Sequence, residues 1–300
     1  MKYLRWLILG ITLFFLIKTF QQHWQDVIKI EFNVSHIKYS IIALLVTFIA
    51  HIWSALVWAS ILKFLHQTAT LSWVLPVYLQ TNLAKYIPGN VWHFYGRIRA
   101  IQSAGGNLNM ATLVTVLEPL LMASAAVLIA MITLLQRELM ITQNPFYNLF
   151  PFLFAGTILI AIHPRFLNPL LSLAGRLKKK AGAEQYPKIK QYPWLPLCGE
   201  IGFVMLRGSG FIITMAGFSS LSLQDFPLLL GVFSLSWFLG LVVPSPGGIG
   251  VFESSAIALL NSTFPPAILL SSLALFRLLS LSAEILAGAL AWGVTVTSHQ

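Results

Sequence analysis

The sequence predicts an all-α, polytopic helical membrane protein with about six to eight transmembrane helices and two broken or re-entrant helix pairs, set in two inverted repeats. Three observations lead to this class. Hydrophobic residues make up 57% of the 300 residues, whereas only 9% are charged, against about 25% in soluble domains. Several apolar runs have the length that crosses a bilayer, and two Pro-Gly interruptions divide such runs. Nine acidic residues cannot keep a chain of this size in water.

The charge and the cysteine content exclude several other classes. The net charge of +10 fits basic loops beside anionic lipid, so it needs no nucleic-acid partner. Cys198 is the only cysteine, which excludes an internal disulfide, a CxxC redox pair and a cysteine-based zinc site.

Apolar runs occur along the whole chain, from Trp6 to Val296. Trp6 to Ile17 follows Lys2 and Arg5 and is not followed by a small-x-small cleavage site, so we expect a retained signal anchor within residues 1–36. The later runs have the lengths of helices that cross: Ser40 to Leu62, Met110 to Leu135, Leu149 to Ile162, Pro196 to Ser219, Phe226 to Val243 and Ala267 to Val296.

Two regions break the pattern of span and loop. The stretch from Leu71 to Ala104 contains Pro88 and Gly89 together with polar residues, and the stretch from Val243 to Asn261 contains Pro246 and a set of glycines, which are Gly247, Gly248 and Gly250. Irregular backbone at membrane depth is tolerated only where protein or a watery cavity surrounds it. Both regions are therefore predicted to be broken or re-entrant helices, with ordinary interhelical loops as the alternative.

Residues 163–193 carry seven basic residues and a single acid, Glu184. A short loop of this kind stays in the cytoplasm. A lipid-headgroup clamp made by Lys178 to Lys180 is the functional alternative, although a charge run beside a span usually only orients it.

An internal repeat links the two interruptions. Shifting the chain by 158 residues aligns Pro88 with Pro246 and Gly89 with Gly247, and produces ten identities in the 41 positions from 88 to 128. One integral membrane domain, 1–300, then divides into 37–135 as the first repeat, 136–193 as a connecting helix and basic loop, and 194–300 as the second repeat. If each broken pair enters and leaves on one side, three full spans separate the repeats, which makes them inverted and both termini cytoplasmic. This is a transporter architecture.

Charged residues at membrane depth usually face a cavity or each other. The first half has basic residues after its break and Glu118 in the next span, whereas the second half has Glu253 after its break and a basic residue in its long span. We expect Arg97 or Arg99 to face Glu253 and Arg277 to face Glu118. The predicted charged cavity for the ionic head of an amphiphile comprises Pro88, Gly89, His93, Arg97, Arg99, Glu118, Pro246, Gly247, Gly248, Gly250, Glu253, Arg277 and Glu284. Simple structural pairing of these charges is the alternative.

Four segments together resemble the lysylphosphatidylglycerol synthase transmembrane-region family, which includes the flippase domain of the multiple peptide resistance factor. They are Tyr86-Ile87-Pro88-Gly89-Asn90-Val91-Trp92 with Arg97, Leu117-Glu118-Pro119, the run from Pro244 to Glu253, and Arg277. The family's first break carries Gly-Glu where Asn90 to Phe94 stand here. The resemblance implies a multi-pass protein of a bacterial-type inner (plasma) membrane that handles lipids, and it does not extend to a synthase domain.

Three functions fit these observations. The first is a translocase of lipids or lipid-linked saccharides without covalent chemistry, and therefore not an enzyme. The second is a membrane-bound lipid-modifying transferase with Glu253 or His93 as base, although no DxD, HxxxxD, GxSxG or HExxH pattern is present. The third is a membrane partner of a separate glycosyltransferase or synthase. We expect no metal, no cofactor and no nucleic acid, and membrane lipids with charged head groups as partners.

The basic loop provides a test of topology. In a Cys198→Ser background, we expect a cysteine at Lys179 to be protected from an impermeant thiol reagent in intact cells and to react after lysis, because the seven basic residues hold the loop inside. Labelling in intact cells would invert the topology.

Overall fold

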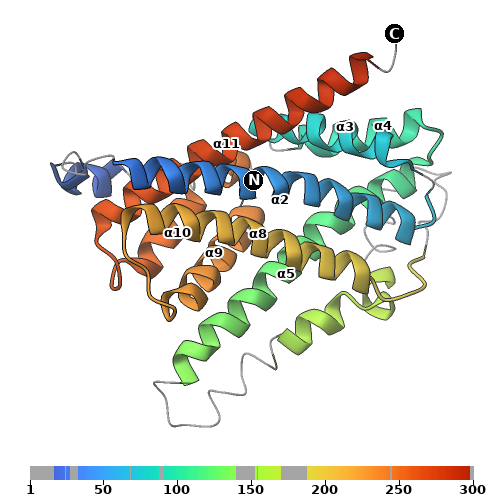
Figure 1. Ribbon diagram of the computed structural model, residues 1–300. Helices are drawn as coiled ribbons and strands as arrows, with labels where there is room; N and C mark the ends of the chain where they lie inside the picture. The colour runs from blue at the N-terminus through green and yellow to red at the C-terminus, as the bar shows by residue number, and fades with distance from the viewer. Residues whose placement is uncertain are drawn as a thin grey trace.

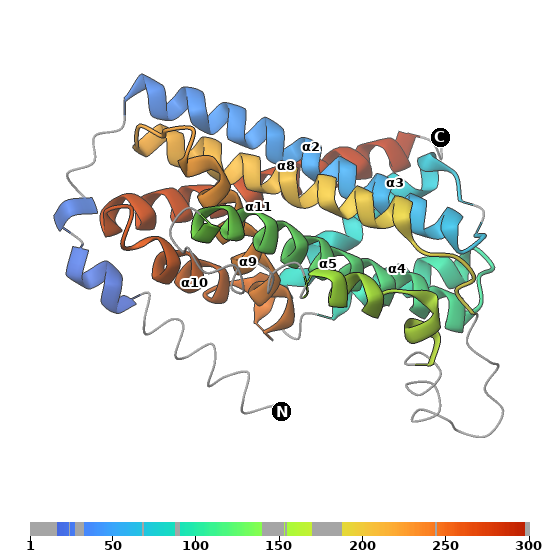
Figure 2. The same ribbon diagram turned by 90° about the horizontal axis from the view of Figure 1, so that it is seen from below.

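The computed structural model describes residues 17–23, 25–27, 33–67, 69–87, 91–139, 153, 155–169, 188–243 and 245–297 (Figure 1). These residues form helices and connections and contain no strand. The helices lie side by side as one bundle, with the long helices crossing its full width (Figure 2).

Among the described residues, five helices are long and apolar enough to cross a membrane. They are α2 (Val34–Phe64), α5 (Leu108–Leu139), α8 (Trp194–Phe218), α9 (Asp225–Val242) and α11 (Pro266–Thr297). The shorter elements are α3 (Leu71–Asn82), η1 (Leu83–Tyr86), α4 (Trp92–Ser103), η2 (Pro246–Gly248) and α10 (Val251–Leu260). The predicted class of helical multi-pass membrane protein is confirmed.

The helices follow the predicted apolar runs closely. The run from Ser40 to Leu62 lies inside α2, which begins earlier because the Asn33 side chain accepts a hydrogen bond from the His36 amide (3.1 Å) and caps the helix. The run from Phe226 to Val243 forms α9, which is long enough to cross. The run from Trp6 to Ile17 lies outside the described residues except for Ile17, and the run from Leu149 to Ile162 is described only in part, as helix over 155–161.

Each half of the bundle repeats one order of elements. A long helix is followed by a broken pair and by a second helix of 32 residues: α2, then α3 with α4, then α5 in the first half, and α8, then α9 with α10, then α11 in the second. The packing between the halves is reciprocal, because α5 lies along α9 while α11 lies along α3, and α5 contacts α8 while α11 contacts α2. Such reciprocity is expected of two copies related by a two-fold axis.

The direction of the repeats follows from the contact between α2 and α8. Trp53 donates from its indole nitrogen to the Gly199 carbonyl (2.8 Å), and His36 packs against Phe218 with ring centroids 4.8 Å apart. Residue numbers therefore fall along α2 as they rise along α8, so these equivalent helices are antiparallel. The repeats are inverted, as the sequence predicts.

Glycines allow α2 and α8 to approach this closely. A methyl group on Gly199 would lie 2.9 Å from a Val57 methyl, and one on Gly210 would lie 2.7 Å from the Thr47 hydroxyl oxygen. Small residues take this role between membrane helices because lipid supplies no hydrophobic drive and close packing must hold the helices together.

The second break is built from glycines in the left-handed region. Gly247, Gly248 and Gly250 have φ of 59°, 72° and 85°, a conformation that costs other residues steric strain. The Glu253 carboxylate accepts a hydrogen bond from the Gly250 amide (2.7 Å) and so starts α10 with its own N-terminal cap. The counterpart residues Pro88 and Gly89 lie outside the described residues, between Ile87 and Val91.

Gly199→Ala tests the contact between α2 and α8. Val57 is only 3% exposed and cannot move away, so we expect the overpacked methyl to lower stability by about 1–3 kcal/mol. Gly293→Ala is the matched control, because a methyl there meets nothing within 4 Å. Thermal unfolding in detergent measures both variants, and equal melting temperatures would contradict the contact.

Candidate functional site

The residues that lead into the first break lie against the second break inside the bundle. η1 packs against η2, and a methyl group on Gly247 would lie 3.0 Å from the Tyr86 ring. The contact places the polar residues that flank each break in one region between the repeats.

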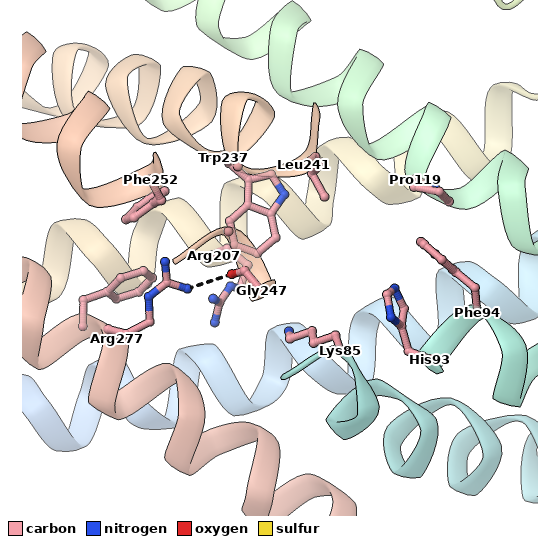
Figure 3. Close-up of a pocket in the computed structure, with 13 residues that line it drawn as sticks. Lys85, His93, Phe94, Pro119, Arg207, Trp237, Leu241, Gly247, Phe252 and Arg277 are labelled. Atoms are coloured by element: carbon pink, nitrogen blue, oxygen red, sulfur yellow. Dashed lines mark hydrogen bonds between the residues drawn. The ribbon is translucent and has the colours of Figure 1, made fainter. Parts of the chain in front are cut away.

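A cavity of about 150 Å³ lies at this meeting point (Figure 3). Three cationic side chains line it from three elements, Lys85 from η1, Arg207 from α8 and Arg277 from α11. The remaining wall is largely aromatic and apolar, comprising Phe94, Pro119, Trp237, Leu241, Phe252 and Phe276, with His93 and the backbone of Gly240, Gly247 and Gly248. A second cavity of about 100 Å³ shares six of these residues and reaches Arg97 and Glu118.

An ion pair joins the first break to the second repeat. The Lys85 ammonium donates to the carboxylate of Glu284 on α11. His51 on α2 faces the same carboxylate, with its Nε2 3.4 Å from Oε1. The carboxylate side chain of Glu284 is only 2% exposed. Its interactions with Lys85 and His51 therefore have to compensate for the hydration that it loses on burial.

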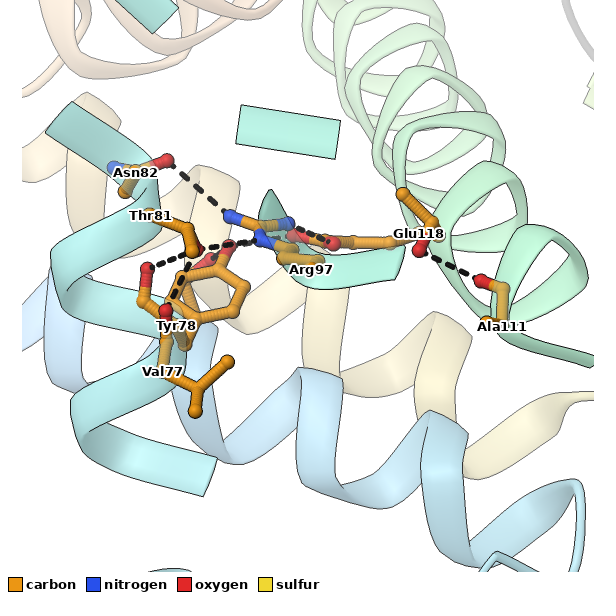
Figure 4. A network of polar contacts seen from close by, with 9 residues as sticks. Val77, Tyr78, Thr81, Asn82, Arg97, Ala111 and Glu118 are labelled. Atoms are coloured by element: carbon orange, nitrogen blue, oxygen red, sulfur yellow. Dashed lines mark hydrogen bonds and ion pairs between the residues drawn. The ribbon is translucent and has the colours of Figure 1, made fainter. Parts of the chain in front are cut away.

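Arg97 lies in a closed network within the first repeat (Figure 4). Its Nη1 donates to Glu118, and its other nitrogens donate to Thr81 (3.4 Å) and Asn82 (3.3 Å). The Tyr78 hydroxyl donates to the second carboxylate oxygen of Glu118 (2.5 Å), while the guanidinium carbon lies 3.8 Å from the Tyr78 ring centroid. The guanidinium nitrogens of Arg97 therefore all donate to side chains of the protein, and Arg97 acts as a structural residue.

Arg277 forms the corresponding pair in the second repeat. Its Nε donates to Glu253 (2.6 Å) and its Nη1 donates to the Gly247 carbonyl (3.3 Å). The other Glu253 oxygen accepts from Gly250. The pair therefore ties α11 to both the break and the start of α10.

The predicted partners of these charges were wrong. Arg97 pairs with Glu118 and Arg277 pairs with Glu253, so both pairs form within a repeat and neither crosses between repeats. The reason is local: a short connection joins α4 to α5, and another joins α10 to α11, so each broken helix packs on the long helix that follows it. The exchange of signs between the halves is confirmed, since the arginine lies on α4 in one and on α11 in the other.

The other predicted site residues divide into three groups. Glu284 reaches the cavity region through Lys85, and His93, Gly247, Gly248 and Arg277 line the cavity. Arg99 is exposed and lines neither cavity. Pro88 and Gly89 lie outside the described residues, and Pro246 begins η2.

Arg207 and Glu200, both on α8, were missed by the sequence-based analysis. Arg207 is 2% exposed, and its Nε and Nη1 find no hydrogen-bond partner in the described part of the chain. Its guanidinium carbon lies 5.1 Å from the Trp237 ring and 5.3 Å from the Phe276 ring. Glu200 is fully buried with both carboxylate oxygens likewise unmatched among the described residues. Arg207 and Glu200 are seven residues apart, about 10 Å along the helix, so they do not pair with each other. The sequence signal that could have identified them is the presence of two charged residues, two turns apart, in an apolar run.

The comparisons with known proteins add no relative. No protein-family model matches this chain, and no curated protein is similar to it at a significant level. In the described ranges, no group of three or more His, Cys, Asp or Glu side chains is placed to hold a metal ion. The cavity and its charges are therefore the features that bear on function.

Double-mutant cycles test the observed pairing. Arg97→Gln and Glu118→Gln each break a buried pair, which costs about 3–5 kcal/mol, and we expect the double variant to lose much less than the sum. Arg97→Gln with Glu253→Gln is the control cycle and is expected to be additive within about 0.5 kcal/mol. Unfolding free energies in mixed micelles measure both cycles. Coupling in the control cycle with additivity in the first would reverse the assignment.

Proposed function

We propose that this membrane-integral protein is a translocase that moves lipids, or lipid-linked saccharides, with an anionic head group across the membrane. The observation that carries the proposal is the buried guanidinium of Arg207, which faces the cavity between the repeats without a hydrogen-bonded partner for two of its nitrogens in the described structure. A buried cation is costly unless it is paired. An anionic ligand supplies the missing partner.

The charge of the cavity favours an anion. Lys85 and Arg277 each have a carboxylate partner, Glu284 and Glu253, while Arg207 adds a third cation. A guanidinium offers a fork of donors that matches phosphate and carboxylate oxygens. Head groups that carry a phosphate therefore fit this region better than neutral sugars or cationic amines alone.

The apolar part of the wall supports an amphiphile in place of a free ion. Trp237, Phe252 and Phe276 surround the cations, and such a wall favours a ligand that brings apolar groups with its charge. The cavity holds a head group, whereas the tails of a lipid must lie outside its volume of about 150 Å³.

Inverted repeats support movement between two sides. The cavity lies where the two broken pairs meet, and each repeat supplies part of its wall. In transporters built this way, the repeats rock or gate against each other around a fixed site. No covalent step is needed, so the proposal assigns no catalytic residue, cofactor or metal.

The resemblance to the lysylphosphatidylglycerol synthase transmembrane region agrees with this proposal and adds its location. We place the protein in a bacterial-type plasma membrane with residues 163–193 on the cytoplasmic side. The two ends of this segment are tied together, because the Asn168 side chain both donates to and accepts from the backbone of Ile189 (2.9 Å each).

Arg207→Met tests the proposal. In proteoliposomes we expect translocation of a fluorescent phosphatidylglycerol to fall at least about tenfold, since a hydrogen bond to a charged group contributes roughly 1.5–3 kcal/mol. Thermal stability should stay the same or rise, because the variant removes a buried charge that lacks a full set of partners. Arg99→Met is the matched control on an exposed arginine and should translocate as the unchanged protein does.

Three outcomes would contradict the proposal. Arg207→Met could translocate normally, or it could lose stability and activity together as a structural residue does. The purified protein could also move no lipid from a panel of anionic, zwitterionic, aminoacylated and polyprenyl-linked lipids. Mass spectrometry of the same lipids separates translocation from a transferase activity, because only a transferase changes their mass.

A further inference from the structure

An apolar groove lies on the far side of the Arg277–Glu253 pair from the charged cavity. It has a volume of about 570 Å³ and runs between the described residues 17–23 and 25–27, α10 and α11. Figure 2 shows residues 17–23 and 25–27 beside these two helices at one edge of the bundle. Its walls are mostly apolar side chains such as Phe20, Ile257 and Leu270, and Glu253 is the one charged residue that lines it in the described part of the chain.

The groove and the cavity meet at adjacent residues of the same two helices. On α10, Phe252 lines the cavity while Glu253 lines the groove. On α11, Arg277 lines the cavity while Ala274, one turn earlier, lines the groove. The Arg277–Glu253 ion pair, with Nε 2.6 Å from Oε1, therefore stands at the boundary between the two spaces.

This arrangement has the two parts that a lipid requires. The head of a lipid is ionic and its tails are apolar, and the structure places a cationic cavity beside an apolar groove with one ion pair between them. The exposed fractions of the pair fit a boundary position, since the side chains of Arg277 and Glu253 are 25% and 13% exposed, whereas those of the Arg97–Glu118 pair are 2% and 4% exposed. A partly exposed pair can exchange one partner for a ligand at lower cost than a fully buried one.

We propose that the groove binds one acyl chain of the lipid whose anionic head group lies in the cavity, and that the Arg277–Glu253 pair is the gate that the head group passes. The inference rests on the proposed translocase function and adds the substrate class, a phospholipid with a long acyl chain. In the gating step the head-group phosphate replaces Glu253 on Arg277. Glu253 keeps its bond to the Gly250 amide, so α10 retains its N-terminal cap while the gate is open.

Filling the groove separates its role from that of the cavity. Ala274 is exposed on α11 and lines the groove, so Ala274→Trp adds a large side chain there without disturbing buried residues. Leu278→Trp is the matched control, because Leu278 lies one turn further on the same helix, is 63% exposed and is not among the groove residues. We expect Ala274→Trp to reduce phosphatidylglycerol translocation about tenfold, as overpacking does at a well-fitted site, and Leu278→Trp to have no effect.

A second pair of variants tests the opposite wall. Gln21 lines the groove whereas its neighbour Gln22 does not, and both are exposed. Gln21→Trp should reduce translocation as Ala274→Trp does, and Gln22→Trp should not. This pair decides the question if Ala274→Trp does not fold, since it leaves α10 and α11 unchanged.

Glycerol 3-phosphate, a soluble head-group analogue without a chain, distinguishes the two proposals. Its binding, measured by calorimetry in detergent, should be equal in the unchanged protein, Ala274→Trp and Gln21→Trp, and should fall in Arg207→Met. Normal phosphatidylglycerol translocation by both groove variants would overturn the acyl-chain groove and leave the cavity in place. Absence of both glycerol 3-phosphate binding and lipid translocation in the unchanged protein would instead refute the translocase function itself.

Discussion

Charge at membrane depth is the constraint on which this structure depends. An ionised side chain away from water is costly unless partners replace the hydration that it loses. Lys85, Arg97 and Arg277 each meet this demand with a carboxylate from a different helix. Each pair therefore also acts as a tie between helices, and together the three ties hold both broken pairs against the long helices.

Two of the three ion pairs join residues of the same repeat, and the third joins residues of different repeats. The Arg97–Glu118 pair joins α4 to α5, and the Arg277–Glu253 pair joins α11 to α10, so both lie in the second half of a repeat. The Lys85–Glu284 pair instead joins η1, just before the first break, to the last helix. Glycines on α8 allow its close approach to α2, and the packing of α5 along α9 and of α11 along α3 adds further contacts between the repeats. The result is two similar units that share one interior, which is where rocking or gating can change access without rebuilding either unit.

Arg207 stands apart from this scheme. It is as buried as Arg97, yet two of its nitrogens meet no partner in the described residues, and aromatic rings surround its guanidinium. Under the proposed function, an anionic ligand is the partner of this cation. The partly exposed Arg277–Glu253 pair lies between that cation and an apolar groove, so the head and the tail of an amphiphile each have a matching surface.

The amino-acid sequence determined the helical membrane class, the places of the main spans and the two breaks. The length of an apolar run and the position of a Pro-Gly pair affect only the helix that contains them, so they can be interpreted without knowledge of tertiary contacts. It also predicted the repeat, which is visible as aligned residues 158 apart, its inversion, which follows from the number of spans between the copies, and the exchange of charge signs, which follows from the residues around the two breaks. The partners of the charges were decided by tertiary structure alone. A sign pattern allows Arg97 to face Glu253 or Glu118 equally well, and the short connection between α4 and α5 selects Glu118. Arg207 became part of the site for the same reason: whether a charge on a long apolar helix meets a partner, lipid or a cavity depends on which helices pack against it.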